Sequence, residues 1–94
     1  MLKDEPDDSF LTYALALEYV KMNELSKAIE IIETLLNRDE NYLGAYYQSG
    51  KLYEETGQID KAIVAYKKGI AIAQKQNNKK TLSELNQALF LVED

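Results

Sequence analysis

Residues 16–32 read ALEYVKMNELSKAIEII, and residues 50–66, which begin 34 positions later, read GKLYEETGQIDKAIVAY. The second stretch repeats the first in the placing of a tyrosine, a turn residue and a Lys-Ala-Ile run. These matches are Tyr19 with Tyr53, Asn23 with Gly57, and Lys27, Ala28 and Ile29 with Lys61, Ala62 and Ile63. A fixed period of this length is typical of helical-repeat proteins, in which each unit buries its apolar face against the next. The sequence therefore predicts two copies of one helical unit.

Each unit is predicted to be a hairpin of two helices, and a further helix follows the second unit. Apolar residues recur at helical spacing, and no window of strand length alternates apolar with polar residues. The expected helices cover residues 8–22, 26–37, 43–56, 60–76 and 81–92. The fold class is therefore predicted to be all-α.

Polar residues and a glycine mark the expected turns and helix starts. Asn23 is expected to stop the first helix, and Gly57 can adopt the left-handed backbone conformation at low cost. Ser26 and Asp60 are predicted to cap the helices that follow these turns. Thr81 is predicted to begin the last helix as the first member of a capping box.

With this period and these residues, the sequence resembles the tetratricopeptide repeat family. The family pattern places small residues, a tyrosine and an alanine at set positions of each unit. The matching residues are Leu15, Ala16, Tyr19 and Ala28 in the first unit, and Tyr46, Gly50, Tyr53, Gly57, Ala62, Tyr66 and Gly69 in the second. Thr12 and Ser49 depart from the pattern where it has an aromatic residue and a leucine, and Glu40 and Gln74 replace its helix-ending proline. The fourth helix is therefore expected to overrun the family boundary.

The resemblance implies a single domain of two helical hairpins that stack with a right-handed twist. An acidic tail at residues 1–7 is expected to precede repeat 1 at 8–42 and repeat 2 at 43–76, and a capping helix is expected within 77–94. Because the sequence opens with Met1 and ends soon after its expected cap, it also resembles small free-standing bacterial members of the family.

The composition argues against catalysis. The 94-residue chain has no histidine, the usual general base near neutral pH, and no cysteine, so nucleophilic thiols, disulfides and thiolate metal sites are excluded. Carboxylate pairs such as Glu54 and Glu55 fit a solvated helix face, and the acids from Asp4 to Asp8 fit the start of a helix. We therefore expect a non-enzymatic scaffold with no catalytic residues, no cofactor and no metal site.

The charge and hydropathy of the chain narrow the class of partner to another polypeptide. The net charge is −5, and the sequence carries no basic stripe of the kind that binds phosphate backbones, so nucleic acid is not an expected partner. No stretch approaches the ~18 apolar residues of a membrane span, so no membrane partner is expected. A cytoplasmic location is expected by default.

The first expected helix carries more apolar residues than one buried face requires. Leu11, Leu15 and Tyr19 are spaced to form its packing stripe. The stripe does not account for four further apolar residues, Phe10, Tyr13, Leu17 and Val20. In the tetratricopeptide repeat family the first helix of each hairpin lines a concave groove. The resemblance therefore implies a contiguous peptide-binding groove, and the residues assigned to it are Phe10, Tyr13, Leu17, Tyr47, Gln48 and Lys51.

Three interpretations of these residues stay open at the level of sequence. Phe10, Tyr13 and Tyr47 can bind a peptide, pack within the chain, or be covered by a second copy in a homodimer. The carboxylate clamp known in the family is expected to be absent, because Tyr13, Leu17 and Gln48 stand at its positions. An extended or helical segment with apolar anchors is the expected ligand, and truncating Tyr13 and Tyr47 is predicted to abolish binding without unfolding the protein.

Overall fold

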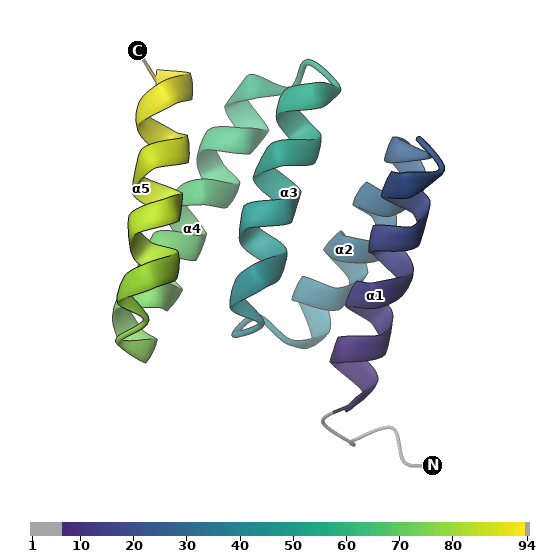
Figure 1. Ribbon diagram of the computed structural model, residues 1–94, viewed down its shortest axis with the longest axis horizontal. Helices are drawn as coiled ribbons and strands as arrows, with labels where there is room; N and C mark the ends of the chain where they lie inside the picture. The colour runs from purple at the N-terminus through teal and green to yellow at the C-terminus, as the bar shows by residue number, and fades with distance from the viewer. Residues whose placement is uncertain (1–6, 94) are drawn as a thin grey trace. The chain divides into compact units, whose positions relative to one another are not determined.

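The computed structural model describes residues 7–93, which form five helices and contain no strand. The helices are α1 (Asp7–Lys21), α2 (Leu25–Arg38), α3 (Leu43–Glu55), α4 (Ile59–Gln76) and α5 (Lys79–Glu93) (Figure 1). Each begins and ends within two residues of its predicted bounds, so the all-α prediction is confirmed. Residues 1–6 of the predicted acidic tail lie outside the described residues, and Asp7 begins α1.

The helices fall into two compact units, divided between Tyr42 and Leu43. In the first unit α1 and α2 run antiparallel and pack against each other (Figure 1). In the second unit α4 packs against both α3 and α5, and successive helices again run antiparallel (Figure 1). Each unit thus contains one helical hairpin, and the second adds a C-terminal helix. The single domain and the right-handed stacking stay predictions.

The two predicted turns share one backbone geometry. Gly57 has φ 78° and is left-handed as predicted. Asn23, which was predicted only to stop the first helix, has φ 61° and is left-handed as well. The N–H of Glu24 donates to the carbonyl of Tyr19 at 2.8 Å, and the N–H of Gln58 donates to that of Tyr53 at 2.7 Å. These bonds satisfy carbonyls at the ends of α1 and α3, where no further helical turn supplies a donor.

A third left-handed turn, which was not predicted from the sequence, ends α4 at Asn77 with φ 59°. The N–H of Asn78 donates to the carbonyl of Ala73 at 3.0 Å, as in the other two turns. Since α2 ends at Arg38, a strict period of 34 would end α4 four residues before Gln76. The predicted overrun of the fourth helix is therefore confirmed.

The predicted side-chain caps are wrong. The N-cap residues of α2 and α4 are Glu24 and Gln58, and neither makes a side-chain cap bond. Each left-handed turn leaves a single residue before the next helix, so Ser26 and Asp60 lie inside the first helical turn. At the start of α5 the amide N–H of Thr81 donates to Oδ1 of Asn78 at 3.1 Å. Asn78, and not Thr81, therefore caps α5.

Small residues set the separation of the helices in the second unit. A Cβ added at Gly50 on α3 would lie 2.2 Å from the nearest ring carbon of Tyr66 on α4, a residue that is completely buried. A Cβ added at Gly69 would lie 2.7 Å from the Cβ of Tyr46 and 3.1 Å from a methyl carbon of Leu85. The glycines therefore give these larger side chains room to pack against the helix backbone.

Ala62→Leu is expected to lower the free energy of unfolding by about 1 to 3 kcal/mol, because Ala62 is completely buried and leaves no space for three more carbons. The neighbouring Lys61→Ala is expected to be nearly neutral, since Lys61 is exposed and loses only a weak solvent-exposed cation–π contact, with its Nζ 5.8 Å from the centre of the Tyr53 ring. Thermal unfolding of both variants tests this prediction, and equal shifts would contradict the assigned helix face.

Candidate functional site

The side of α1 that packs against α2 differs from the predicted one. Ala16 is completely buried, whereas Leu11 and Leu15 are 62% and 50% exposed. Ser9, two helical turns before Ala16, donates from Oγ to Oδ2 of Asp39 at 2.8 Å and so marks the same side. The predicted packing stripe of Leu11, Leu15 and Tyr19 is therefore wrong for both leucines. The small side chain of Ala16 lies in this contact and lets α1 and α2 approach closely.

We define the α1 face as the predicted residues Phe10, Tyr13 and Leu17. Phe10 is 60% exposed, whereas Tyr13 and Leu17 are half-buried. The ring of Tyr13 lies 5.3 Å from that of Tyr42, centre to centre, and is tilted by 44°. Burial raises the pKa of Tyr13 above its usual value, and the neighbouring Tyr42 adds to the rise. Tyr13 is therefore a half-buried packing residue of the first unit, and Phe10 is the most accessible member of the face.

Polar contacts hold the N-terminal half of α1 against the end of α2. Nη2 of Arg38 donates to Oγ1 of Thr12 at 3.1 Å and lies 3.7 Å from the carboxylate of Asp8. These contacts, with the bond from Ser9 to Asp39, fix the rotation of α1 about its axis. Because these contacts fix the side of α1 that faces α2, they leave Phe10 exposed.

We define the α3 face as the predicted residues Tyr47, Gln48 and Lys51, which are all half-buried and share one side of α3. Nζ of Lys51 lies 5.8 Å from the centre of the Tyr47 ring, within reach of a cation–π contact. The Tyr47 ring lies 6.3 Å from that of Tyr66 on α4 and is tilted by 48°. The structure therefore brings the predicted residues of the second unit together and supports them from α4.

Two further residues, Glu54 of α3 and Tyr66 of α4, border the α3 face. The hydroxyl of Tyr66 donates to the carboxylate of Glu54, one helical turn beyond Lys51. Burial raises the pKa of Tyr66 well above its usual value, and the hydrogen bond to Glu54 and the charge of Glu54 add to the rise. Tyr66 matches the repeat pattern in the sequence, but no sequence signal pairs it with Glu54, which lies twelve positions earlier on another helix. Lys51 thus lies beside Tyr47, and Glu54 lies beside Tyr66, so the pair of tyrosine rings has one cation and one anion next to it.

Raising the pH above 10 is expected to lower the free energy of unfolding. In the unfolded chain Tyr66 ionises near pH 10, whereas its raised pKa in the folded state keeps it protonated. The unfolded state then binds fewer protons, so stability falls by up to ~1.4 kcal/mol per pH unit. Urea titrations between about pH 8 and about pH 11 should show a smaller decline in the free energy of unfolding for Tyr66→Phe than for the wild type. An equal decline would show that Tyr66 is not the group responsible.

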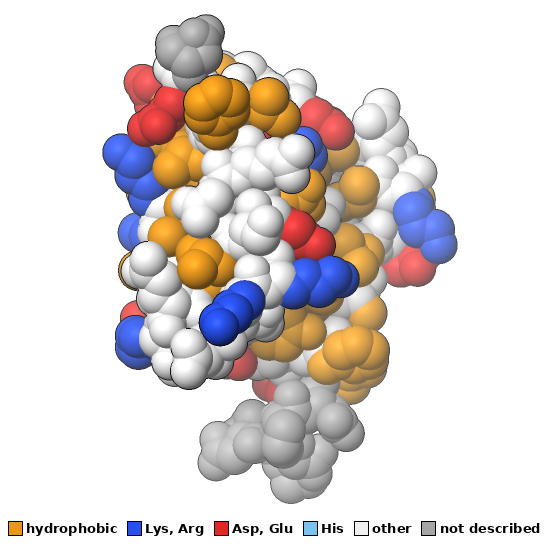
Figure 2. Space-filling view, turned by 60° about the vertical axis from the view of Figure 1, so that its left-hand side comes forward, with side chains coloured by type: hydrophobic (Ala, Val, Ile, Leu, Met, Phe, Trp, Pro, Cys, Tyr) orange, Lys and Arg blue, Asp and Glu red, His pale blue; other side chains and the backbone are white. Residues whose placement is uncertain are grey.

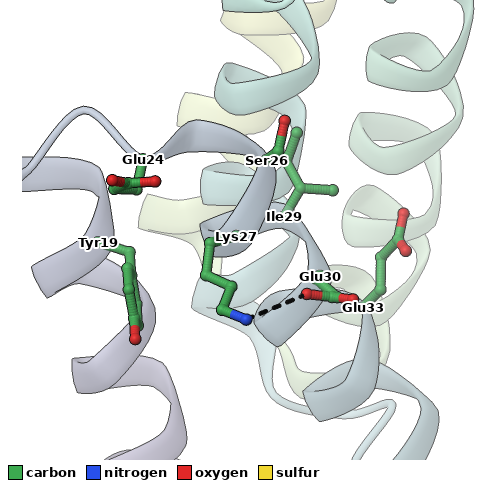
Figure 3. Close-up of a pocket in the computed structure, with 7 residues that line it drawn as sticks. All are labelled: Tyr19, Glu24, Ser26, Lys27, Ile29, Glu30 and Glu33. Atoms are coloured by element: carbon green, nitrogen blue, oxygen red, sulfur yellow. Dashed lines mark ion pairs between the residues drawn. The ribbon is translucent and has the colours of Figure 1, made fainter.

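An open hollow on the first unit was not predicted from the sequence. It is lined by Tyr19, Glu24, Ser26, Lys27, Ile29, Glu30 and Glu33 (Figure 3). Nζ of Lys27 lies 3.8 Å from Oε1 of Glu30, and its side chain points toward that residue (Figure 3). Five of the lining residues are on α2, Tyr19 is on α1 and Glu24 lies in the turn between them, and the hollow is too open to enclose a ligand.

Over residues 7–93, no group of three or more His, Cys, Asp or Glu side chains is arranged to hold a metal ion. Within the same range, every helix is too short or too polar to cross a membrane. The α1 face and the α3 face belong to different units, and each is described within its own unit. Their union into one contiguous groove stays a prediction.

Comparison with known proteins identifies the repeat. The sequence profile described as "Tetratricopeptide repeat" matches residues 12–42 and 43–76. A tetratricopeptide repeat-containing protein of Methanocaldococcus jannaschii is 30% identical over 74 residues, which cover 79% of this chain and 23% of that protein. The chain therefore spans less than a quarter of the length of this relative.

Two solved structures of a tetratricopeptide repeat domain protein from Salinibacter ruber are similar to the chain. The solution NMR structure has a TM-score of 0.89 and 41% identity, and the match covers 96% of this chain and 91% of that one. The crystal structure has a TM-score of 0.88 and 42% identity, with 92% of this chain and 97% of that one covered.

Proposed function

The chain belongs to the tetratricopeptide repeat family, and we propose that it binds a segment of another polypeptide through the α1 face and the α3 face. The family fold is that of a protein-interaction module, which fixes the general class of function. The observation that carries the finer proposal is the accessible aromatic and cationic surface of these faces: Phe10 is 60% exposed, and Lys51 lies over the ring of Tyr47. Aromatic side chains are among the residues that most often anchor protein interfaces, and a charged side chain such as that of Lys51 orients the bound partner.

The two faces are suited to different parts of a ligand. The α1 face is apolar, so it is suited to an apolar side chain of the bound segment. The α3 face combines Tyr47 with Lys51 and is bordered by Glu54, so it favours polar and charged groups and sets their orientation. Because two repeats offer a small contact area, we expect dissociation constants on the order of 1 µM or weaker.

The proposed role involves no catalytic step and no cofactor. Histidine and cysteine are missing from the sequence, and the tetratricopeptide repeat family consists in general of non-catalytic scaffolds. The acid that borders the α3 face has a structural role, because the carboxylate of Glu54 accepts a hydrogen bond from the hydroxyl of Tyr66. The faces therefore supply recognition alone.

A second candidate is self-association, in which the α1 face is covered by another copy of the chain. The exposure of Phe10, at 60%, favours this candidate as much as it favours peptide binding. The two candidates differ in concentration dependence, because a self-association surface becomes covered as the protein is concentrated. A peptide that binds the α1 face should then bind more weakly at high protein concentration.

Selection of ligands from a phage-displayed library of random peptides tests the proposal. The strongest peptide is synthesised, and its affinity is measured by calorimetry for the wild type and for Phe10→Ala and Lys51→Ala. Both variants are expected to bind ~10-fold more weakly. They are preferable to Tyr13→Ala and Tyr47→Ala, whose rings pack on Tyr42 and Tyr66, so that their removal also affects stability.

Val64→Ala is the matched control, because Val64 is 51% exposed on α4 and lies on neither face. The control is expected to bind like the wild type. Equal weakening in all three variants, or unchanged binding in both face variants, would show that the peptide binds elsewhere. Circular dichroism spectra identical to the wild type are required of each variant, since unfolding also removes binding.

A further inference from the structure

Two leucines of α1 and the residue directly after its end form an exposed stripe, which we call the α1 stripe: Leu11, Leu15 and Met22. The N–H of Met22 donates to the carbonyl of Glu18 at 3.1 Å, so Met22 continues the path of the helix. They are 62%, 50% and 58% exposed, and their spacing of four and seven residues places them on one side of the helix. The side chains of the α1 face lie elsewhere on α1. The α1 stripe is therefore a second accessible apolar surface, separate from the proposed peptide-binding residues.

The internal repeat allows the exposed leucines of α1 to be compared with the equivalent residues of α3. The residues 34 positions after Leu11 and Leu15 are Ala45 and Ser49 of α3, which are 0% and 5% exposed. The same repeat positions thus carry buried small residues in the second unit and exposed large apolar residues in the first. Exposed leucines at positions where the repeat buries its side chains indicate a surface that is suited to another helix.

The last turn of α5 carries the matching surface. Phe90 and Leu91, which we call the α5 pair, are 77% and 70% exposed, more than any other large apolar residue over residues 7–93. Figure 2 shows hydrophobic side chains gathered on the surface at the C-terminal end of α5. Leu85 and Ala88 are buried and attach α5 to its own unit, so the α5 pair is free to contact a separate molecule.

The charges of the two helices select their relative direction. The start of α1 is acidic, with Asp8 in its first turn, and its end carries Lys21. The start of α5 is basic, with Lys79 and Lys80, and its end carries Glu93. A parallel alignment therefore places opposite charges together at both ends, whereas an antiparallel alignment pairs acid with acid at one end and base with base at the other.

The ion pairs already present do not remove this complementarity. Lys80 lies 3.8 Å from Glu84, and their side chains are 87% and 50% exposed. Asp8 lies 3.7 Å from Arg38, and these side chains are 43% and 45% exposed. Exposed pairs of this kind are weak, so both groups can also face a charge on a second molecule.

We propose that α5 of one copy packs in parallel along the α1 stripe of a second copy. The α5 pair contacts Leu15 and Met22, and Lys80 lies near Asp8 of the other copy. Because the two surfaces differ, the contact is head-to-tail, and every complex keeps one free α1 stripe and one free α5 pair, so longer chains can form. A single helix–helix contact is smaller than a standard protein interface, so we expect a dissociation constant on the order of 100 µM.

Two variants that each block one surface test the proposal by analytical ultracentrifugation. Leu11→Ser with Leu15→Ser blocks the α1 stripe, and Phe90→Ser with Leu91→Ser blocks the α5 pair. The average mass of the wild type is expected to rise between ~10 µM and ~1 mM, well beyond a dimer. Each blocked variant alone is expected to stay monomeric, and an equimolar mixture of the two is expected to form a dimer and nothing larger.

Other outcomes identify other contacts and overturn the proposal. Dimers of the α5-blocked variant alone would mean that two α1 stripes pair, and dimers of the α1-blocked variant alone would mean that two α5 pairs meet. A wild type that remains monomeric at ~1 mM would rule out the contact. Val64→Ser is the control for loss of an exposed apolar residue, since Val64 is 51% exposed on α4, and it is expected to associate like the wild type.

The charge arrangement supplies a test that leaves every apolar residue in place. Lys79→Glu with Lys80→Glu is expected to weaken association ~10-fold, and Asp8→Lys in the second component of a mixture is expected to restore part of it. Raising the salt concentration to ~0.5 M should weaken the association of the wild type as well, because salt screens the charges. Association that is unchanged in the Lys79→Glu, Lys80→Glu variant would overturn the parallel direction of the two helices.

Discussion

Gly50→Ala is expected to lower the free energy of unfolding by about 3 kcal/mol, at the upper end of the usual cost of overpacking. The new Cβ would lie 2.2, 2.5 and 2.6 Å from three carbons of the Tyr66 ring. That ring is completely buried, and its hydroxyl donates to Glu54, so it has no room to move away. Urea unfolding measures the loss.

Gly57→Ala is the matched control, because the chemical change is the same and no atom lies within 4 Å of the added Cβ. Its cost arises from the left-handed backbone alone and is expected to be about 1 kcal/mol. Equal losses in the two variants would show that the contact between Gly50 and Tyr66 is looser than described.

The first unit suggests how the Gly50 clash can be relieved. At the equivalent positions, 34 residues earlier, it has Ala16 and Ile32 in place of Gly50 and Tyr66. The double variant Gly50→Ala with Tyr66→Ile copies this pair, so it is expected to lose less stability than the sum of its two single variants. Strict additivity would mean that the two positions do not share space.

Leu85→Ala is expected to lower the free energy of unfolding by about 2 to 5 kcal/mol, the range for a fully buried leucine. Leu85 is completely buried, and a Cβ added at Gly69 would lie 3.1 and 3.3 Å from its two methyl carbons. This side chain therefore packs closely on α4 and attaches α5 to its unit. Truncation leaves a cavity that neighbouring helices fill only in part.

Leu91→Ala serves as the control for Leu85→Ala, because it makes the same truncation on the same helix at a side chain that is 70% exposed. In dilute solution this control is expected to change the free energy of unfolding by less than about 0.5 kcal/mol. A large loss for Leu91→Ala and a small one for Leu85→Ala would reverse the assigned faces of α5.

The period of 34 predicted most of the local structure, because it superimposes two independent sets of helix signals. Asn23 and Gly57 occupy equivalent turns and adopt the same left-handed conformation. Asn77 was missed because it has no repeat partner. The side-chain caps were predicted wrongly because the left-handed turns begin the next helix earlier than polar residues such as Ser26 suggest.

The contacts of individual side chains were harder to predict from the sequence. The first helix is apolar on several sides, so hydrophobic spacing alone could not choose between Leu11 and Ala16 as the buried side. Tyr13 packs on Tyr42, which lies outside every helix, where no periodic pattern could indicate it. Tertiary contacts of this kind depend on the angle between helices, which the sequence does not encode locally.

The most direct test of the proposed binding faces is an NMR titration of ¹⁵N-labelled protein with the peptide selected from the library. If the proposal is correct, amide signals around Phe10 and Leu17 of α1 and around Tyr47 and Lys51 of α3 shift, while those of the outer sides of α2 and α4 stay in place. Shifts confined to α2, α4 or the end of α5 would contradict the proposal and place the binding site on another surface.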